Sequence, residues 1–249
     1  MKTTKPTNIL MSVVLFAMAI CCSSCGKDIE MPEPPPLPEN SIAYIYKGDN
    51  KDGLAFKTLL EGNKCAVTLI SKNDIASVDF AGYKMIVLDN NTDVAEGGTH
   101  WTDVETNKLK DVKKPMLLIG IGGLQFAEKI GNTSRYGNAA QWNDKGFLVG
   151  DNTSKLYTTP KRIDIPASSA GIHLYNTAVP GCGQHIAPGS ILNGNIYVGK
   201  FFTAADYYPV TVERNRYMNF GFQKGVSEMN QTGKDFIVNL CYYTADLTL

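Results

Sequence analysis

Runs of apolar residues alternate with segments of mixed polarity along the first half of the chain. Residues 41–48 form a β-rich run that ends at a Gly-Asp-Asn turn, and 65–71 form a second such run. Between them, 52–64 carry leucines among polar residues and stop at Gly-Asn, the pattern of a helix and its terminator. Residues 85–88 are apolar at every position, which is typical of a central strand in a parallel sheet.

The next segments continue this alternation. Residues 100–112 predict a polar-faced helix in which Thr102 and Glu105 can form a capping box. Residues 114–123 predict a fourth strand that enters a glycine-rich turn, after which another helix starts. Because the order β-α-β-β-α-β-α has short connections, we expect an α/β fold with a flavodoxin-like, doubly wound, mostly parallel sheet and helices on both faces.

The second half of the chain has a different pattern. In residues 132–209, approximately, short β-like pieces are separated by Gly, Pro, Asn and Ser, which predicts an antiparallel or loop-rich insertion. Strands are expected again in 207–215 and 216–223, and a terminal helix in 230–247. Residues 41–249 have the length of a single domain.

The first residues have the pattern of an export signal. Lys2 and Lys5 precede an apolar stretch at 9–20, which is too short to span a bilayer as a mature helix, and small residues follow. Two serines before Cys25 favour this cysteine as the lipidated N-terminus of a bacterial lipoprotein, with the two earlier cysteines as alternatives. An ordinary cleaved signal with incidental cysteines is the other interpretation. We therefore predict a lipoprotein signal peptide at 1–24.

The segment that begins at Cys25 predicts a tether and a location. Residues 25–40 are rich in Pro and Glu and should form a semi-extended tether. Residues 27–30 resemble the export signal of Bacteroidetes surface lipoproteins. We expect an exported protein that is lipid-anchored in the cell envelope, at the outer membrane and exposed at the surface, because several acyl chains together give durable anchoring.

The charge balance and the cysteine count narrow the class of protein. Without residues 1–24 the chain has 22 basic and 24 acidic residues, so its charge gives no reason to expect nucleic acid as a partner. The domain contains Cys65, Cys182 and Cys241, and an odd number of cysteines cannot form a closed disulfide framework.

Three stretches resemble the class I glutamine amidotransferase-like superfamily, including its trehalose-utilisation-type relatives. They are residues 79–91, 114–131 and 216–243, and the resemblance extends over nearly all of 41–249. Catalytic members of this superfamily carry a Cys nucleophile in a strand-turn-helix elbow, in a pattern like G-x-C-x-G-x-Q. The resemblance implies a flavodoxin-like fold and directs attention to the residues at the elbow.

The catalytic positions of that superfamily are degenerate in this chain. When Gly123 and Gln125 are placed on the last Gly and Gln of the motif, Ile121 falls on the nucleophile. The superfamily's His and Glu follow a late strand, where Gln223 and Gly225 are nearest. Glutamine has no accessible pKa for proton transfer and glycine has no side chain, so the resemblance predicts a pseudoenzyme without the hydrolytic triad.

Polar residues after the third predicted strand and the glycine-rich turn after the fourth should meet at one edge of the sheet. Open α/β sheets bind ligands at the carboxyl ends of their strands, which makes this edge a candidate ligand rim. Its residues are Asp89, Asn90, Asn91, Gly122, Gly123 and Gln125. The alternatives are an Asx-rich turn and glycines that relieve crowding.

The rim sequence matches no complete motif for binding an anion or a metal ion. Its glycines could bind an anion through free backbone N–H groups, but no Lys-Ser/Thr follows them, and they stand after the fourth strand where a dinucleotide fingerprint would follow the first. The oxygen-rich run at 89–93 lacks the spacing of an EF-hand. We predict no metal and no cofactor. Trp101 nearby is expected to pack rather than to stack on a sugar.

Cys182 and His185 are the residual catalytic candidates. Such a pair can form a nucleophile and its base or two metal ligands, but neither motif is complete in this sequence. Glycines and prolines surround the pair, so the alternative is a loop whose polar residues face water.

Together these observations predict an envelope-anchored lipoprotein whose domain binds a ligand or partner at the carboxyl rim of its sheet. Besides the membrane, the expected partner is a carbohydrate or an envelope protein, with a role in glycan uptake. One alternative is a hydrolase or sugar-modifying enzyme whose active site has moved to Cys182 and His185. The other is a structural assembly module without a small ligand.

Overall fold

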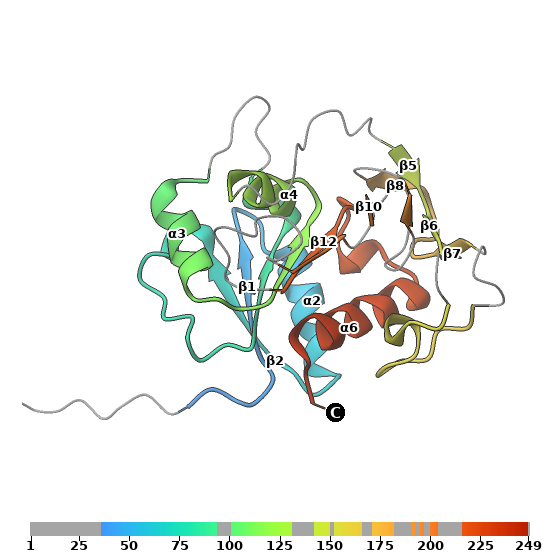
Figure 1. Ribbon diagram of the computed structural model, residues 1–249, viewed down its shortest axis with the longest axis horizontal. Helices are drawn as coiled ribbons and strands as arrows, with labels where there is room; N and C mark the ends of the chain where they lie inside the picture. Colours follow the sequence, from blue (N-terminus) through green and yellow to red (C-terminus); the bar gives the residue numbers. More distant parts are fainter. Residues whose placement is uncertain are drawn as a thin grey trace, which may run out of the picture. The chain divides into compact units, whose positions relative to one another are not determined.

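A central sheet organises the protein (Figure 1). The computed structural model describes residues 36–93, 101–130, 142–149, 152–165, 171–181, 191–192, 195–196, 200–203 and 216–248. Within these ranges the sheet contains β1 (Ser41–Tyr46), β2 (Ala66–Ser71), β3 (Met85–Leu88), β4 (Met116–Ile119), β11 (Lys200–Thr203) and β12 (Arg216–Phe220). Their order across the sheet is β11-β12-β4-β3-β1-β2.

The strand order defines the fold class. Neighbouring strands are parallel except at the edge, where β11 runs antiparallel to β12. The parallel strands therefore follow the order 2-1-3-4-5 of flavodoxin-like folds, which confirms the predicted architecture. The apolar run at 85–88 coincides with β3, and all of its side chains are buried, as expected when both faces of a parallel sheet are covered.

Helices cover both faces of this sheet (Figure 1). They are α2 (Lys51–Glu61), α3 (Asp103–Asp111), α4 (Gly120–Lys129) and α6 (Gln231–Ala245). Side chains alternate along a strand, so Tyr44 of β1 packs on one face with α2 and α6, whereas Ala43 and Ile45 pack on the other with α3 and α4. None of the helices in the described ranges has the length and apolar character needed to cross a bilayer.

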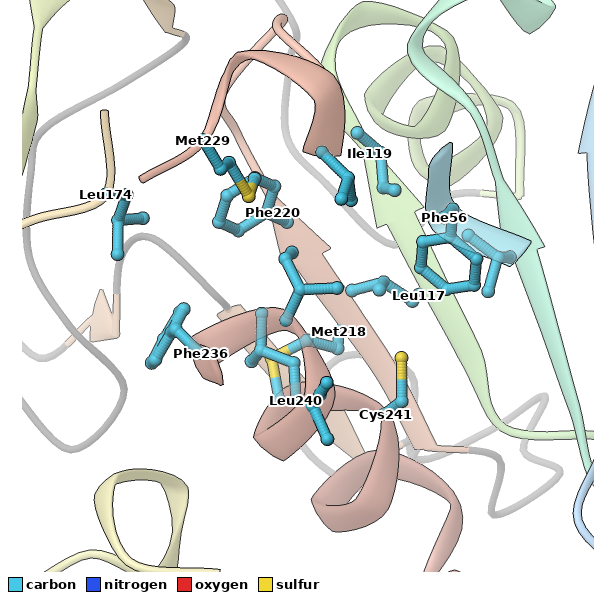
Figure 2. Close-up of a cluster of buried hydrophobic side chains, with 14 of the residues drawn as sticks. Phe56, Leu117, Ile119, Leu174, Met218, Phe220, Met229, Phe236, Leu240 and Cys241 are labelled. Carbon is cyan, nitrogen blue, oxygen red and sulfur yellow. The ribbon is translucent and has the colours of Figure 1, made fainter. Parts of the chain in front are cut away.

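Helix α6 closes one face of the sheet. Figure 2 shows Phe236 and Leu240 of α6 near Met218 and Phe220 of β12, with Leu117 of β4 beside them. Each of these side chains is buried, and full burial of such an apolar side chain contributes about 1.5–3 kcal/mol. The sheet edge that carries the candidate site is therefore supported by a dense apolar layer.

The N-terminal ends of α3 and α4 lie near the candidate site. The expected capping box opens α3, because Thr102 Oγ1 accepts from the Glu105 N–H at 3.2 Å and Glu105 Oε2 accepts from the Thr102 N–H at 2.8 Å. The junction after Ile119 differs from the expectation. The glycines that the sequence places in a bend before α4 form the first turn of that helix.

Short antiparallel pairs make up the described part of the predicted insertion. They are β5 (Trp142–Asp144) with β8 (Val179–Gly181), β6 (Gly146–Leu148) with β7 (Gly171–His173), and β9 (Ile191–Leu192) with β10 (Asn195–Ile196). In the described part of the insertion, they confirm the predicted antiparallel pairing. The strand expected at 207–215 lies outside the described residues, as does the signal segment 1–24.

Candidate functional site

The turn between β4 and α4 is tight and carries no nucleophile. Gly120 has φ +54°, in the left-handed region that glycine adopts without a steric penalty. A Cβ on this residue would lie 2.1 Å from Oδ1 of Asn90. The residue with left-handed backbone is therefore Gly120, the first residue of α4, and it comes one residue before the Ile121 that the motif aligns with the nucleophile. Neither residue has a side-chain atom that can attack a substrate.

The side chain of Asn90 lies against the N-terminal end of α4. Asn90 belongs to a short 3-10 helix, η2 (Asn90–Thr92), directly after β3. Its Oδ1 accepts a hydrogen bond from the N–H of Ile121 at 2.8 Å. Gly122 lets η2 and α4 touch, because a Cβ there would lie 2.3 Å from Thr92 Oγ1. One of the free N–H groups that an anion would need is thus already bound within the protein, and close packing accounts for the glycines.

Gly123 and Gln125 are enclosed in the same packing. A Cβ on Gly123 would lie 2.4 Å from the carbonyl carbon of Leu118, so a larger residue would push α4 away from β4. Gln125 is buried, and with its amide nitrogen turned toward Asp93 it donates to Oδ2 at 2.9 Å. The sequence suggests that both residues belong to a ligand rim. In the structure both are buried, Gly123 against β4 and Gln125 against Asp93.

A buried charge network holds η2 and α4 together. Lys72 donates from Nζ to the carbonyl oxygen of Thr92 at 3.1 Å, and its Nζ lies 3.9 Å from Glu105 Oε2. The same ammonium lies 4.0 Å from the ring centroid of Trp101, which donates from Nε1 to the carbonyl oxygen of Gly122 at 3.1 Å. Burial lowers the pKa of Lys72, and the charge of Glu105 opposes this change. Trp101 is a packing residue in this network.

Asp89 is a buried carboxyl group at the end of β3. It is 2% exposed, and burial raises its pKa to about 6. The Tyr44 hydroxyl and the Asn90 N–H partly offset this rise, whereas the charge of Asp52 adds to it. Oδ1 accepts from the Asn90 N–H at 2.8 Å, and no described residue reaches Oδ2 with a hydrogen bond of ordinary geometry. Asp89 therefore changes charge near neutral pH beneath the rim.

A polar pocket lies where the chain segments after β1, β3 and β12 meet. Its volume is about 160 Å³, and its walls are Asp49, Lys51, Asp52, Asn91, Lys224, Ser227 and Glu228. The winding of the sheet reverses between β1 and β3, and open α/β sheets bind ligands outside the carboxyl ends of such strands. All the expected rim residues are described, and of these Asn91 lines the pocket.

Hydrogen bonds hold the pocket walls in place. Asn91 donates from Nδ2 to the carbonyl oxygen of Asp49 at 2.8 Å and accepts from the Lys47 N–H at 3.0 Å, which joins the segments after β3 and β1. On the other side, the Ser227 hydroxyl donates to Asp52 Oδ1 at 2.9 Å and joins the segment after β12 to α2. The walls are therefore formed before a ligand arrives.

The positions nearest the superfamily's His and Glu lie next to this pocket. The N–H of Gln223 donates to the carbonyl oxygen of Pro180 at 3.0 Å, so the segment after β12 contacts β8. A Cβ on Gly225 would lie 2.2 Å from Cγ of Asp52. A side chain at position 225 would therefore displace Asp52 from the pocket wall.

Several sequence candidates lie elsewhere. Cys182 and His185 are outside the described residues, and so is the lipidation candidate Cys25. Cys65 and Cys241 are buried free thiols, in keeping with a role in packing. In the part of the chain that the structure describes, no group of three or more His, Cys, Asp or Glu side chains is arranged to hold a metal ion.

Sequence reasoning missed most of the pocket. Asp49, Asp52, Ser227 and Glu228 come from two segments far apart in the chain, and no local motif marks them. A usable signal was nonetheless present. Asp49 follows the first strand much as Asp89 follows the third, and these two strands are neighbours in a flavodoxin-like sheet.

Comparisons with known proteins give distant structural similarities. The chain matches no protein-family model and no curated protein sequence. It is similar to a solved structure described as a GMP synthase component from Thermoplasma acidophilum, with 15% identity, a TM-score of 0.46, and coverage of 82% of this chain and 94% of that one. It is also similar to PurLQS from Thermotoga maritima, with 14% identity, a TM-score of 0.40, and coverage of 83% and 99%. The class of protein follows from the strand order itself, which is that of an α/β domain with a flavodoxin-like sheet.

Proposed function

We propose that this chain is a non-catalytic binding protein of the cell envelope, which holds a polar group of its ligand in the pocket between Asp52, Asn91 and Glu228. The observation that carries the proposal is the place of this pocket. It opens at the carboxyl ends of β1 and β3, the switch point at which flavodoxin-like sheets bind their ligands. Its volume of about 160 Å³ suits one end of a ligand rather than a whole drug-sized molecule.

The surroundings of the elbow favour binding over catalysis. Gly120 and Ile121 offer no nucleophile, and Asn90 fills the space at the start of α4. Gln223 cannot transfer a proton at accessible pH, and Gly225 cannot orient a base. An amidotransferase-type hydrolysis has no residues to perform it at these positions.

The N-terminal pattern supports an anchored protein. Residues 1–24 fit a lipoprotein signal, Cys25 fits the acylated residue, and 25–40 fit a tether to the outer membrane. The chain enters β1 at Ser41, and the pocket lies beyond the other end of this strand, roughly 20 Å away for six residues. Within the domain, the pocket and Ser41 therefore lie at opposite ends of β1.

A glycan panel tests this function, since carbohydrate is the ligand class expected of an envelope lipoprotein. The chain from residue 25 is prepared with Cys25→Ser and screened by ligand-observed NMR. We expect the protein to bind a subset of glycans. Asn91→Ala should bind them at least roughly tenfold more weakly, because it removes the hydrogen bonds that join the segments after β1 and β3. The matched control is Asn73→Ala, an exposed residue after β2. No response across the panel would contradict the carbohydrate class and leave an envelope protein as the partner.

A second function of a different class has one observation in its favour. The hydrogen bond from Gln223 to Pro180 brings β8, which directly precedes Cys182 in the chain, beside the segment after β12. A hydrolase or sugar-modifying enzyme would then use Cys182 and His185. Cys182→Ser should abolish any turnover of a panel of esters and glycosides, and a wild-type chain without turnover contradicts this alternative. An assembly module without a small ligand would bind nothing in either screen.

A further inference from the structure

The charges around the pocket are unevenly distributed. Asp49, Asp52 and Glu228 contribute carboxylates, whereas Lys51 and Lys224 contribute ammonium groups. Among the described residues, no ion pair joins a pocket carboxylate to a pocket lysine. The carboxylates are therefore not neutralised by direct contact, and the pocket has an excess of negative charge.

Groups beneath the pocket respond to this excess. Burial raises the pKa of the Tyr175 hydroxyl well above its usual value, and the charges of Asp52 and Glu228 add to the rise. Tyr175 donates to the carbonyl oxygen of Lys224 at 2.6 Å, so it lies directly under the pocket wall. Asp52 also raises the pKa of Asp89, after the larger effect of burial. Asp89 after β3 and Tyr175 after β7 thus both face the negative charge of Asp52.

Acceptor atoms for a cation are already in position. Ser227 donates to Oδ1 of Asp52, and no donor among the described residues reaches Oδ2. The carboxylate of Glu228 is exposed and likewise accepts no hydrogen bond from a described residue. Because Gly225 leaves room for Asp52 and Ser227 holds it, the Asp52 side chain loses little freedom when a ligand binds.

The size of the pocket limits the kind of cation. A volume of about 160 Å³ is well below the roughly 300–1,000 Å³ of pockets that hold a drug-sized ligand. This is enough for an ammonium group and the carbons next to it. The described side chains form no cluster of the kind that holds a metal ion, so an organic cation fits better. A primary ammonium has three N–H donors, which suits a site with several carboxylate acceptors.

We infer that the pocket selects ligands by a protonated amino group, as found in amino sugars and other primary amines, which Asp52 and Glu228 bind through charge-assisted hydrogen bonds. This inference rests on the proposed function and adds the chemical class of the ligand. The remainder of the ligand lies outside the pocket, at the exposed edge of the sheet.

A series of sugars with one ring and different charges tests the selection. Glucosamine, glucose and glucuronate are titrated into the chain from residue 25 with Cys25→Ser, at about pH 6.5, where the amine is largely protonated. Glucosamine should bind about tenfold more tightly than glucose, glucuronate should bind more weakly than glucose, and added salt should reduce the difference. Butylammonium and butanol repeat the comparison without a sugar ring.

Isosteric variants locate the effect. Asp52→Asn keeps an oxygen for Ser227, and both it and Glu228→Gln should weaken glucosamine binding about tenfold, and by more than they weaken glucose binding. Asp74→Asn removes an exposed carboxylate after β2, outside the pocket, and should have little effect. Equal affinity for glucosamine and glucose, or glucosamine binding unaffected by both variants, would overturn the inference.

The outcomes also separate this inference from the proposed function. A chain that binds neutral glycans through the Asn91 wall, but neither glucosamine nor butylammonium, contradicts selection of a cation and keeps the binding function. A chain that binds neither the neutral nor the cationic probes contradicts selection of a cation and carbohydrate as the ligand class. Binding of butylammonium without any sugar supports the cation site and argues against carbohydrate as the ligand class.

Discussion

The substitution Asp89→Asn tests the electrostatics at the end of β3. Burial raises the pKa of this carboxyl group from 3.8 to about 6, so the folded protein holds the proton more tightly than the unfolded chain does. Protonation of Asp89 therefore adds to the free energy of unfolding. This contribution is complete below about pH 3.8 and is lost as the pH rises through about 6. The groups that face it are Tyr44 on β1, Asp52 on α2 and the N–H of Asn90 on η2.

The magnitude follows from the size of the pKa change. A rise of about two units corresponds to about 3 kcal/mol at 1.36 kcal/mol per unit. Between about pH 4.5 and 7.5, roughly 2 kcal/mol of this stability is lost through Asp89. Asn has no charge to bury and keeps an oxygen for the Asn90 N–H. The stability of Asp89→Asn relative to the wild-type chain should therefore increase by about 2 kcal/mol over this range.

Urea unfolding at a series of pH values measures this difference. Circular dichroism gives the free energy of unfolding of both proteins, and subtraction cancels the titration of every group that they share. Asp74→Asn, which removes an exposed carboxylate, should show a nearly constant difference from wild type. A difference between Asp89→Asn and wild type that stays constant within about 0.5 kcal/mol across the range would refute the reasoning.

Three further changes test the turn, the core and the anchor. Gly120→Ala should cost roughly 2–3 kcal/mol in urea titrations, because Ala is strained at φ +54° and its Cβ would displace the Asn90 side chain from the Ile121 N–H. Gly62→Ala, at φ −65°, is the matched control and should change stability little. Asn239→Ala should cost about 3 kcal/mol by the same measure, since its buried amide donates to two backbone carbonyls at 2.8 Å each, and unchanged stability would contradict this. Cys25→Ser should abolish labelling by a fatty-acid probe in cells and release the protein from membranes, whereas retained label would rule out acylation at this residue.

The elements of the fold could be predicted because they depend on neighbours in the chain. The apolar run at 85–88 marks β3 without reference to any other segment, since a strand covered on both faces needs an apolar residue at each position. The capping box of Thr102 and Glu105 spans a single helical turn. The order of these elements then restricts the sheet to a few topologies, of which the flavodoxin-like one is observed.

The candidate site could not be predicted in the same way, because its contacts join distant segments. Asn90 and Ile121 are 31 residues apart, and Asp52 and Ser227 are 175 residues apart. The motif around Gly120 correctly indicates a strand that passes into a helix. It does not indicate that η2 fills the space in front of that helix, because this depends on how closely β3 and β4 bring their next residues together.

The packing of η2 against the start of α4 and the polar pocket both depend on how the segments after the strands meet at the carboxyl edge of the sheet. Once η2 packs against α4, a ligand can approach this edge through the gap that the segments after β1, β3 and β12 leave. Gly225 matters there because its missing side chain gives Asp52 its place in the wall. A glutamate introduced at position 225 would therefore push Asp52 aside instead of rebuilding a catalytic group. On the proposed function, the missing side chain of Gly225 is what leaves Asp52 its place in the wall of the binding pocket.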